Sequence, residues 1–334
     1  MMKLLNAIIG WSLQNRLAVV ALWACIAIAG VVSFLQLPMD AFPDTTPVQV
    51  QVNATAPALA PLEVERQITF PIEQALSGLP GLEEVRSVSK FGFSQVTLVF
   101  EEGADLWRAR QTVAERLSGV SLPDGIAPAQ LGPVATGLGE VFHFLVQGEG
   151  KSLAELRTIQ DWIVKPQLRS VPGVAEVNTW GGDERRIEVV VDPHNLQKFG
   201  LSLADLVAAL ETNNANVGGG TLADAGEATL VQGIGVLTSL SGIERVVIAA
   251  HGGVPIRVGD VATVTDGREI RRGAVTADGK GESVLGLGFM LIGENSHDVT
   301  TRLALRLDDV RKSLPEGIHL DTVYERTTLV DHVL

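Results

Sequence analysis

One long apolar run dominates the pattern of hydrophobic and polar positions along the chain. It extends from Leu17 to Leu35 without a charged residue. At a rise of about 1.5 Å per residue it forms a helix of roughly 28 Å, close to the hydrocarbon thickness of a bilayer. The run therefore predicts a transmembrane helix that anchors the rest of the chain.

A cleaved signal peptide and a buried core helix are the alternatives to an anchor. The apolar part of a signal peptide is usually about 7 to 15 residues long and precedes a cleavage site of small residues. Here the run is longer, and Gln36-Leu37-Pro38 follows it. Ser33 is its only polar interruption, which disfavours a core helix. The pattern favours the anchor over both.

Alternating and helical patterns follow the run in a regular order. Val48–Ala54 alternates with period two, as a half-buried strand does. Ala60–Leu76 has apolar residues at helical spacing, with Pro71 predicting a kink. Two further strands and a helix capped by Asp105 are predicted at Leu82–Ser89, Ser94–Phe100 and Asp105–Leu117. With a short strand after Gly125, this order is that of a ferredoxin-like βαββαβ unit.

Two short turn motifs of this unit, each with a proline and a glycine, recur later in the chain. Leu79-Pro80-Gly81 is echoed by Val171-Pro172-Gly173, 92 residues further on. Leu122-Pro123-Asp124-Gly125 is echoed by Leu314-Pro315-Glu316-Gly317, at a separation of 192 residues. The second copy therefore contains an insertion of about 100 residues.

The second copy and its insertion have patterns of their own. The copy is predicted to contain strands at Val141–Gln147, Val174–Trp180, Ser283–Ile292 and near His319–Tyr324, and helices at Leu153–Val171 and His297–Leu314. The insertion, about Gly181 to Arg272, has a strand at Ile187–Val191 and a helix at Leu203–Leu210. Asn213–Gly235 is rich in small and polar residues and predicts a flexible loop or a protruding hairpin. The predicted fold class is α+β, with one transmembrane helix, two ferredoxin-like units and a small α+β insertion in the second.

Charge gives the orientation of the anchor. Lys3 and Arg16 are the only charged residues up to Leu37, and all 39 acidic residues follow. Because basic flanks stay on the cytoplasmic side, we expect the following domains in the periplasm of a Gram-negative bacterium. The formal net charge of −13 disfavours a nucleic-acid partner. Cys25, the single cysteine, lies inside the apolar run, which excludes a disulfide framework.

Several strings, in their order and spacing, resemble the heavy-metal branch of resistance-nodulation-division (RND) efflux pumps, the CzcA and CusA type. They are Leu37-Pro-Met-Asp-Ala-Phe-Pro-Asp44, Ser89-Lys-Phe-Gly-Phe-Ser94, Phe100-Glu-Glu-Gly-Ala-Asp105 with Arg108-Ala-Arg110, Gly132-Pro-Val-Ala-Thr-Gly-Leu-Gly-Glu140 and Gln160-Asp-Trp162. The resemblance covers essentially the whole chain.

The resemblance implies a division of the chain. Residues 1–37 would be the cytoplasmic N-terminus and first transmembrane helix, and 38–133 the first porter subdomain. Residues 134–180 and 273–328 would be the halves of the second porter subdomain, 181–272 the docking subdomain, and 329–334 the start of a link to a second transmembrane helix. The arm Asn213–Gly235 would reach into a neighbouring protomer.

The resemblance also implies the mode of action. Such pumps are homotrimers in the inner membrane that work with a periplasmic adaptor and an outer-membrane channel, and proton influx drives them. They need no cofactor besides the transported cation and the proton gradient. The chain would be about one third of a pump. The family's proton relay uses carboxylates of a later helix, and Leu17–Leu35 contains no acid.

Strand parity selects candidate cation ligands. His143 and Glu176 are expected on outward faces of their strands, where a solvated polar residue is the alternative interpretation. On Ser283–Ile292 we expect Leu285, Leu287, Phe289 and Leu291 to pack inward, with Gly286, Gly288 and Met290 outward. Glu140 is added because the resemblance places it in a string typical of divalent-cation members. Carboxylate and imidazole suit divalent ions such as zinc or cobalt, whereas copper(I) or silver(I) would favour methionine clusters.

Two other functions remain open. The chain could be a single-pass anchored binding or scaffold module, or part of a drug-exporting pump of the same superfamily. An enzyme is disfavoured, because the sequence has no phosphate loop, no Gly-x-Ser-x-Gly and no His-Glu-x-x-His.

Overall fold

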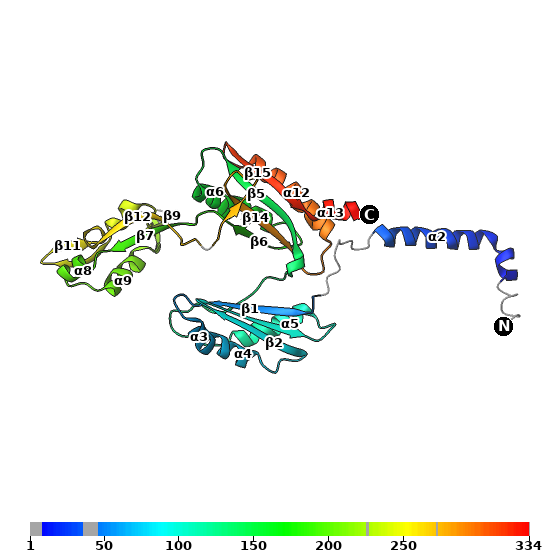
Figure 1. The fold of residues 1–334 in the computed structure, drawn as a ribbon, viewed down its shortest axis with the longest axis horizontal. Coiled ribbons are helices and arrows are strands. Elements are labelled where there is room, and N and C mark those ends of the chain that lie inside the picture. The colour runs from blue at the N-terminus through cyan, green and yellow to red at the C-terminus, as the bar shows by residue number, and fades with distance from the viewer. Residues whose placement is uncertain (1–8, 36–45, 225–226, 272, 334) are drawn as a thin grey trace.

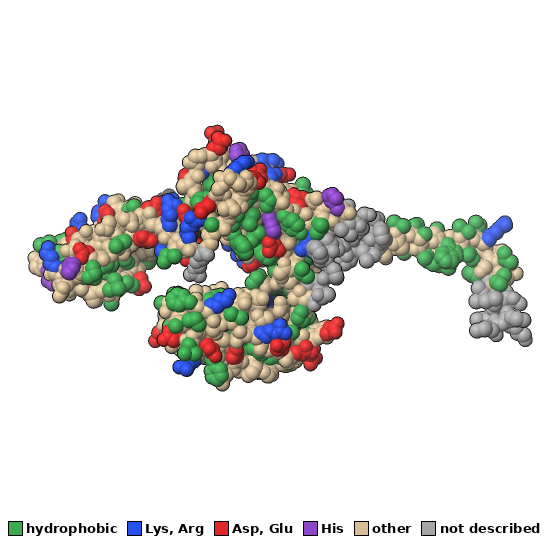
Figure 2. Space-filling view, in the orientation of Figure 1, with side chains coloured by type: hydrophobic (Ala, Val, Ile, Leu, Met, Phe, Trp, Pro, Cys, Tyr) green, Lys and Arg blue, Asp and Glu red, His purple; other side chains and the backbone are tan. Residues whose placement is uncertain are grey.

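The computed structural model describes residues 9–35, 46–224, 227–271 and 273–333 (Figure 1). The string Leu37 to Asp44 lies outside the described residues. Helix α2 (Arg16–Leu35) stands apart from the other elements, and most of its apolar side chains from Leu17 to Val32 are exposed (Figure 2). Within the described ranges it is the one helix long and apolar enough to cross a membrane. The predicted span is confirmed in its position.

The first unit is a four-stranded antiparallel sheet with helices on one face. Its elements are β1 (Gln49–Thr55), α3 (Pro61–Val64), α4 (Phe70–Leu76), β2 (Leu82–Lys90), β3 (Phe93–Phe100), α5 (Leu106–Leu117) and β4 (Gln130–Leu131). The strand order is β2-β3-β1-β4. Val50, Val52 and Ala54 of β1 are buried and their neighbours are not, as period two requires. The predicted order of strands and helices is confirmed.

The second unit repeats this topology. Its elements are β5 (Glu140–Gly148), α6 (Leu153–Ile159), α7 (Lys165–Arg169), β6 (Val174–Trp180), β13 (Val275–Thr276), β14 (Glu282–Met290), α12 (Ser296–Lys312) and β15 (Ile318–Glu325), followed by α13 (Arg326–Val333). The strands β6, β14, β5 and β15 lie side by side in that order, with the short β13 also paired to β14. This matches β2-β3-β1-β4 of the first unit, as an interrupted repeat requires.

Both units share an irregular helix. In the first, a π turn (Glu65–Thr69) joins α3 to α4 and ends two residues before Pro71. In the second, a π turn (Gln160–Val164) joins α6 to α7 and ends two residues before Pro166. Proline lacks the N–H of a regular helical bond, and a π turn accommodates the break. The kink predicted at Pro71 takes this form.

The insertion forms a separate body, on the side of the second unit opposite to α2 (Figure 1). Its elements are β7 (Arg185–Val191), α8 (Pro193–Phe199), α9 (Leu203–Asn213), β8 (Val217–Asp224), β9 (Glu227–Gly233), α10 (Leu240–Glu244), β10 (Val247–His251), β11 (Val254–Arg257), α11 (Val258–Val261) and β12 (Ala262–Arg268). Strands β7 and β12 pair and lead into and out of a small core of its own. The segment Asn213–Gly235 contains the paired strands β8 and β9, the hairpin of the two structures predicted.

The predicted facing of β14 is wrong. Val284 and Met290 belong to the helix-covered core, and Gly286 and Gly288 lie on that same face. A side chain at Gly286 would collide with the ring of Phe144, and one at Gly288 would lie 3.2 Å from Leu303 of α12. The ring of Phe144 occupies the space beside Gly286, and Leu303 of α12 occupies the space beside Gly288. The alternating leucines therefore lie on the other face of the sheet, and Met290 is not an outward thioether.

Candidate functional site

The three residues predicted to bind a cation lie at one end of the sheet of the second unit. Glu140 of β5 and Glu176 of β6 are both register partners of Phe289, because β14 runs between their strands. Two strand spacings, about 10 Å, therefore separate them. His143 is the β5 partner of Leu287, two residues further along β14 and on the same face. The predicted residues thus share a region, with Glu176 apart from the other two.

The side chains of Glu140 and His143 are in direct contact. The Oε1 atom of Glu140 lies 2.6 Å from Nε2 of His143, and both side chains are about one third exposed or less. The contact is not directed as a hydrogen bond, since Nε2 of His143 has no such partner. On the other side, the imidazole packs against the ring of Tyr324 of β15, with ring centroids 4.8 Å apart. Two metal-ligand types therefore meet at this end of the sheet.

A bulge in β5 makes this pair possible. Phe142 is opposite Gly288 and Glu140 is opposite Phe289, so Val141 is an extra residue in its strand. Without a bulge, residues three apart on a strand point to opposite faces. A matching irregularity on β6 makes Ala175 the extra residue beside Glu176.

Arg326, the first residue of α13, ties this end of the sheet to the connection between the two units. Its side chain is 3% exposed and donates to the carbonyl oxygens of Leu138 and Glu140. Leu138 lies in the short 3-10 turn Gly137–Gly139, which directly precedes β5. Because α13 continues from β15, a movement of this helix would act directly on the residues beside Glu140.

Glu176 faces a different space. Its carboxylate accepts a hydrogen bond from the amide of Asn178, two residues along β6. Both residues line a cleft of about 580 Å³ between the first and second units. Figure 2 shows the hollow between the two bodies.

The described residues contain no group of three or more His, Cys, Asp and Glu side chains placed to hold a metal ion. Glu140 and His143 supply two donors, and Glu176 supplies a third from another part of the sheet. Their role as cation ligands therefore stays a prediction.

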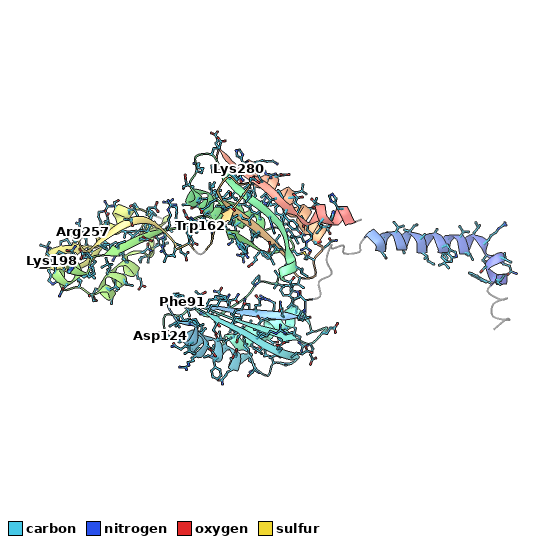
Figure 3. All side chains as sticks on the ribbon, in the orientation of Figure 1. Phe91, Asp124, Trp162, Lys198, Arg257 and Lys280 are labelled. Carbon is cyan, nitrogen blue, oxygen red and sulfur yellow. The ribbon has the colours of Figure 1, made fainter. Side chains whose placement is uncertain are left out.

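The strings that carried the resemblance contain structural residues that strand parity did not identify. Ser89 and Ser94 face each other across the hairpin of β2 and β3, and Thr69 of the π turn bonds to both hydroxyls, at 2.8 and 2.7 Å. Phe91 lies at the exposed tip of that hairpin (Figure 3). Asp105 caps α5 by accepting from two backbone N–H groups, as predicted. The three hydroxyls and the Asp105 cap stabilise the first unit.

The string Gln160-Asp-Trp162 stabilises the backbone at the start of the insertion. Asp161 accepts from Arg157 and from Thr179, each at 2.6 Å. Arg157 in turn donates to the carbonyl of Gly181, where the chain leaves β6 for the insertion. Trp162 is 80% exposed beside this point (Figure 3). The signal for this contact was the string itself, since neither parity nor charge marks it.

The model of the AcrB/AcrD/AcrF family matches residues 8–334. Protein HelA of Legionella pneumophila is 49% identical over 337 residues, which cover 98% of this chain and 32% of that protein. The cobalt-zinc-cadmium resistance protein CzcA of Cupriavidus metallidurans is 44% identical over 338 residues, with the same two shares. A crystal structure of a heavy metal efflux pump superposes with a TM-score of 0.85 at 32% identity, covering 95% of this chain and 32% of that one. The chain spans about a third of the length of these relatives.

Proposed function

The chain belongs to the AcrB/AcrD/AcrF family and is the N-terminal portion of an RND heavy-metal efflux pump, and we propose that the whole protein exports divalent cations such as zinc, cobalt or cadmium. Proton influx would drive this transport, with the relay residues outside the present chain. Helix α2 would hold the protein in the inner membrane, with the two units and the insertion in the periplasm.

The bodies of the structure have corresponding roles in this proposal. Residues 38–133 would be the first porter subdomain, ferredoxin-like in topology, and residues 134–180 with 273–328 the second. The insertion, 181–272, would be the docking subdomain that meets an outer-membrane channel, with a periplasmic adaptor beside it. The hairpin of β8 and β9 would reach into the next protomer of a homotrimer. Its separation from the core of the insertion supports this role.

One observation supports the divalent substrate most directly. The chain is 44% identical, over 98% of its length, to a protein named for cobalt, zinc and cadmium resistance. The pairing of a carboxylate with an imidazole at Glu140 and His143 agrees with such ions, because both ligands suit borderline divalent metals. Met290, which lies in the core, offers no support for a thioether site.

Growth of a deletion strain tests this function. We expect loss of tolerance to zinc, cobalt or cadmium, restored by the full-length gene, with unchanged tolerance to silver, copper and hydrophobic drugs. Sensitivity to drugs alone would contradict the metal assignment and favour the drug-exporting branch. Restoration by a gene truncated after α2 and the two units would favour an anchored binding module instead.

A further inference from the structure

The cleft between the two units is lined by basic side chains from both of them. Arg110 comes from α5 of the first unit, and Lys165 and Arg169 come from α7 of the second. Among the described residues that line the cleft, Glu176 is the only acid. A cleft of this composition attracts anions, although the protein as a whole is acidic.

These three cations have no anionic partner in the described part of the chain. No Asp or Glu lies within ion-pairing distance of Arg110, Lys165 or Arg169. Four other arginines of the two units do have such a neighbour: Arg86, Arg157, Arg302 and Arg311. Burial lowers the pKa of Arg110, because its charge is partly removed from water without an acid beside it. An anion in the cleft would offset that desolvation.

Neutral donors complete the lining. Asn53 of β1 and Gln130 of β4 are register partners, and both line the cleft from the first unit. Asn178 lines it from β6 of the second unit. Side-chain amides provide N–H donors that bind carboxylate oxygens without adding charge. Donors thus lie on both walls, and a ligand with a single anionic group would meet only one of them.

We propose that this cleft binds a small polycarboxylate anion, with Arg110 on one wall and Lys165 and Arg169 on the other. Guanidinium groups match carboxylates with two parallel N–H bonds, and an ammonium adds a point charge. The ligand could enter as the free anion or as an anionic chelate of a divalent metal, since both present the same carboxylate oxygens. The proposal is independent of the transport function, because binding is measured without a membrane potential.

Removal of the Glu176 carboxylate has opposite expected effects for an anion site and for a cation site. Its carboxylate repels an anion in the cleft, so its removal should strengthen anion binding. If the cleft instead held a bare metal cation, removal of the same carboxylate should weaken metal binding. The two alternatives therefore differ in the direction of one measured change.

Calorimetric titration of the full-length protein in detergent with citrate, at low ionic strength, tests the proposal. R110Q and K165Q should each weaken citrate binding by about 10-fold or more, the usual effect of losing a charged hydrogen bond. R116Q, on the exposed part of the same helix as Arg110, is the matched control and should change it by less than about 2-fold. E176Q should tighten binding. R169Q, at an exposed position, repeats the test where folding is not at risk.

Titrations with and without equimolar zinc identify the form of the ligand. Binding of citrate alone assigns the free anion, and binding only with zinc assigns the chelate, and either supports the cleft as a polycarboxylate site. Failure of both, an equal effect of R116Q and R110Q, or weaker binding by E176Q would overturn the proposal. Tighter binding of inorganic phosphate than of citrate would also overturn it. None of these results depends on whether the deletion strain is sensitive to metals.

Discussion

Glu140 and His143 are brought within 2.6 Å of each other by the one extra residue, Val141, between their two rows in β5. The pair lies beside the ring of Tyr324 and next to the backbone that Arg326 holds. It therefore sits where the connection between the two units, the sheet of the second unit and helix α13 meet. A change in the charge or ligation of the pair would therefore act on the connection, the sheet and helix α13.

If the pair binds the exported cation, its removal should reduce metal tolerance. We expect E140Q and H143Q in the full-length protein to lower the zinc concentration that cells tolerate, because loss of a ligand or of its partner costs about 10-fold or more in metal affinity. E149Q, at an exposed acid just beyond β5, is the control and should behave as wild type. Wild-type tolerance in all three variants, at equal protein levels, would remove the pair from the cation route.

The collision at Gly286 predicts a strong and local effect on stability. G286A places a methyl group into the ring of Phe144, and overpacking of a filled core costs about 1–3 kcal/mol. G218A, where a side chain would meet nothing within 4 Å, should change stability by less than about 0.5 kcal/mol. Thermal unfolding in detergent measures both. Equal stability of the two variants would contradict the facing of β14 described above.

Glycine explains why the sequence predicted most of the fold but not this face. On β1, the alternation of Val50 and Val52 with polar neighbours identified the core directly. On β14, Leu285 and Leu287 gave an equally clear alternation, but the ring of Phe144 from β5 fills the core side beside Gly286. The alternation along one strand assigns faces to the side chains of that strand alone. It cannot show that a ring from the adjacent strand fills the space beside a glycine.

The candidate site was predictable only in part for a related reason. The positions of His143 and Glu176 on outward faces follow from the period of two. The contact of Glu140 with His143 depends on a bulge, and no residue pattern in Glu140–His143 signals one. The basic cleft combines α5 with α7, which are distant in sequence and meet only through the packing of the two units.

The hydroxyl cluster around Thr69 predicts that the string Ser89 to Ser94 is structural. T69V keeps the shape of the side chain but leaves the buried hydroxyl of Ser94 without this partner. An unsatisfied buried polar group costs about 1–3 kcal/mol, and chemical denaturation should show a loss of that size. S87A, which removes an exposed hydroxyl of β2, the strand that contains Ser89, should cost less than about 0.5 kcal/mol. A small loss in T69V would show that water replaces the bond.

The capping box of α6 predicts a pH-dependent contribution to the stability of the folded state. The backbone N–H and the hydroxyl of Ser152, with a smaller effect of Lys151, hold the pKa of Glu155 below its ordinary value of 4.5. A lowered pKa in the folded state means that this stabilisation is present above the unfolded value and is lost as pH falls through the folded value. E155Q should therefore be less stable than wild type near pH 7, and the difference should shrink as pH falls below 4.5 and through the lowered folded-state pKa. A difference independent of pH, measured by melting temperatures, would contradict the ionic origin.

The contact at Gly181 predicts that one carboxylate controls the order of the connection to the insertion. In D161N, Thr179 keeps an acceptor, but Arg157 loses its charged partner and with it the orientation that directs it to the carbonyl of Gly181. Because the side chains of Arg157 and Asp161 are only about one fifth exposed, we expect a loss of about 1–3 kcal/mol.

Hydrogen exchange measures that loss where it acts. Amides of 179–183 should exchange faster in D161N, while those of β14 in the core change little. D266N, which breaks the half-exposed pair of Asp266 with Arg185 on the nearby strands β7 and β12, is the control and should have little effect. Faster exchange in D266N than in D161N would mean that the paired strands, and not the helix of the second unit, hold the insertion in place. The two variants therefore distinguish a connection fixed by the second unit from one that relies on its own strands.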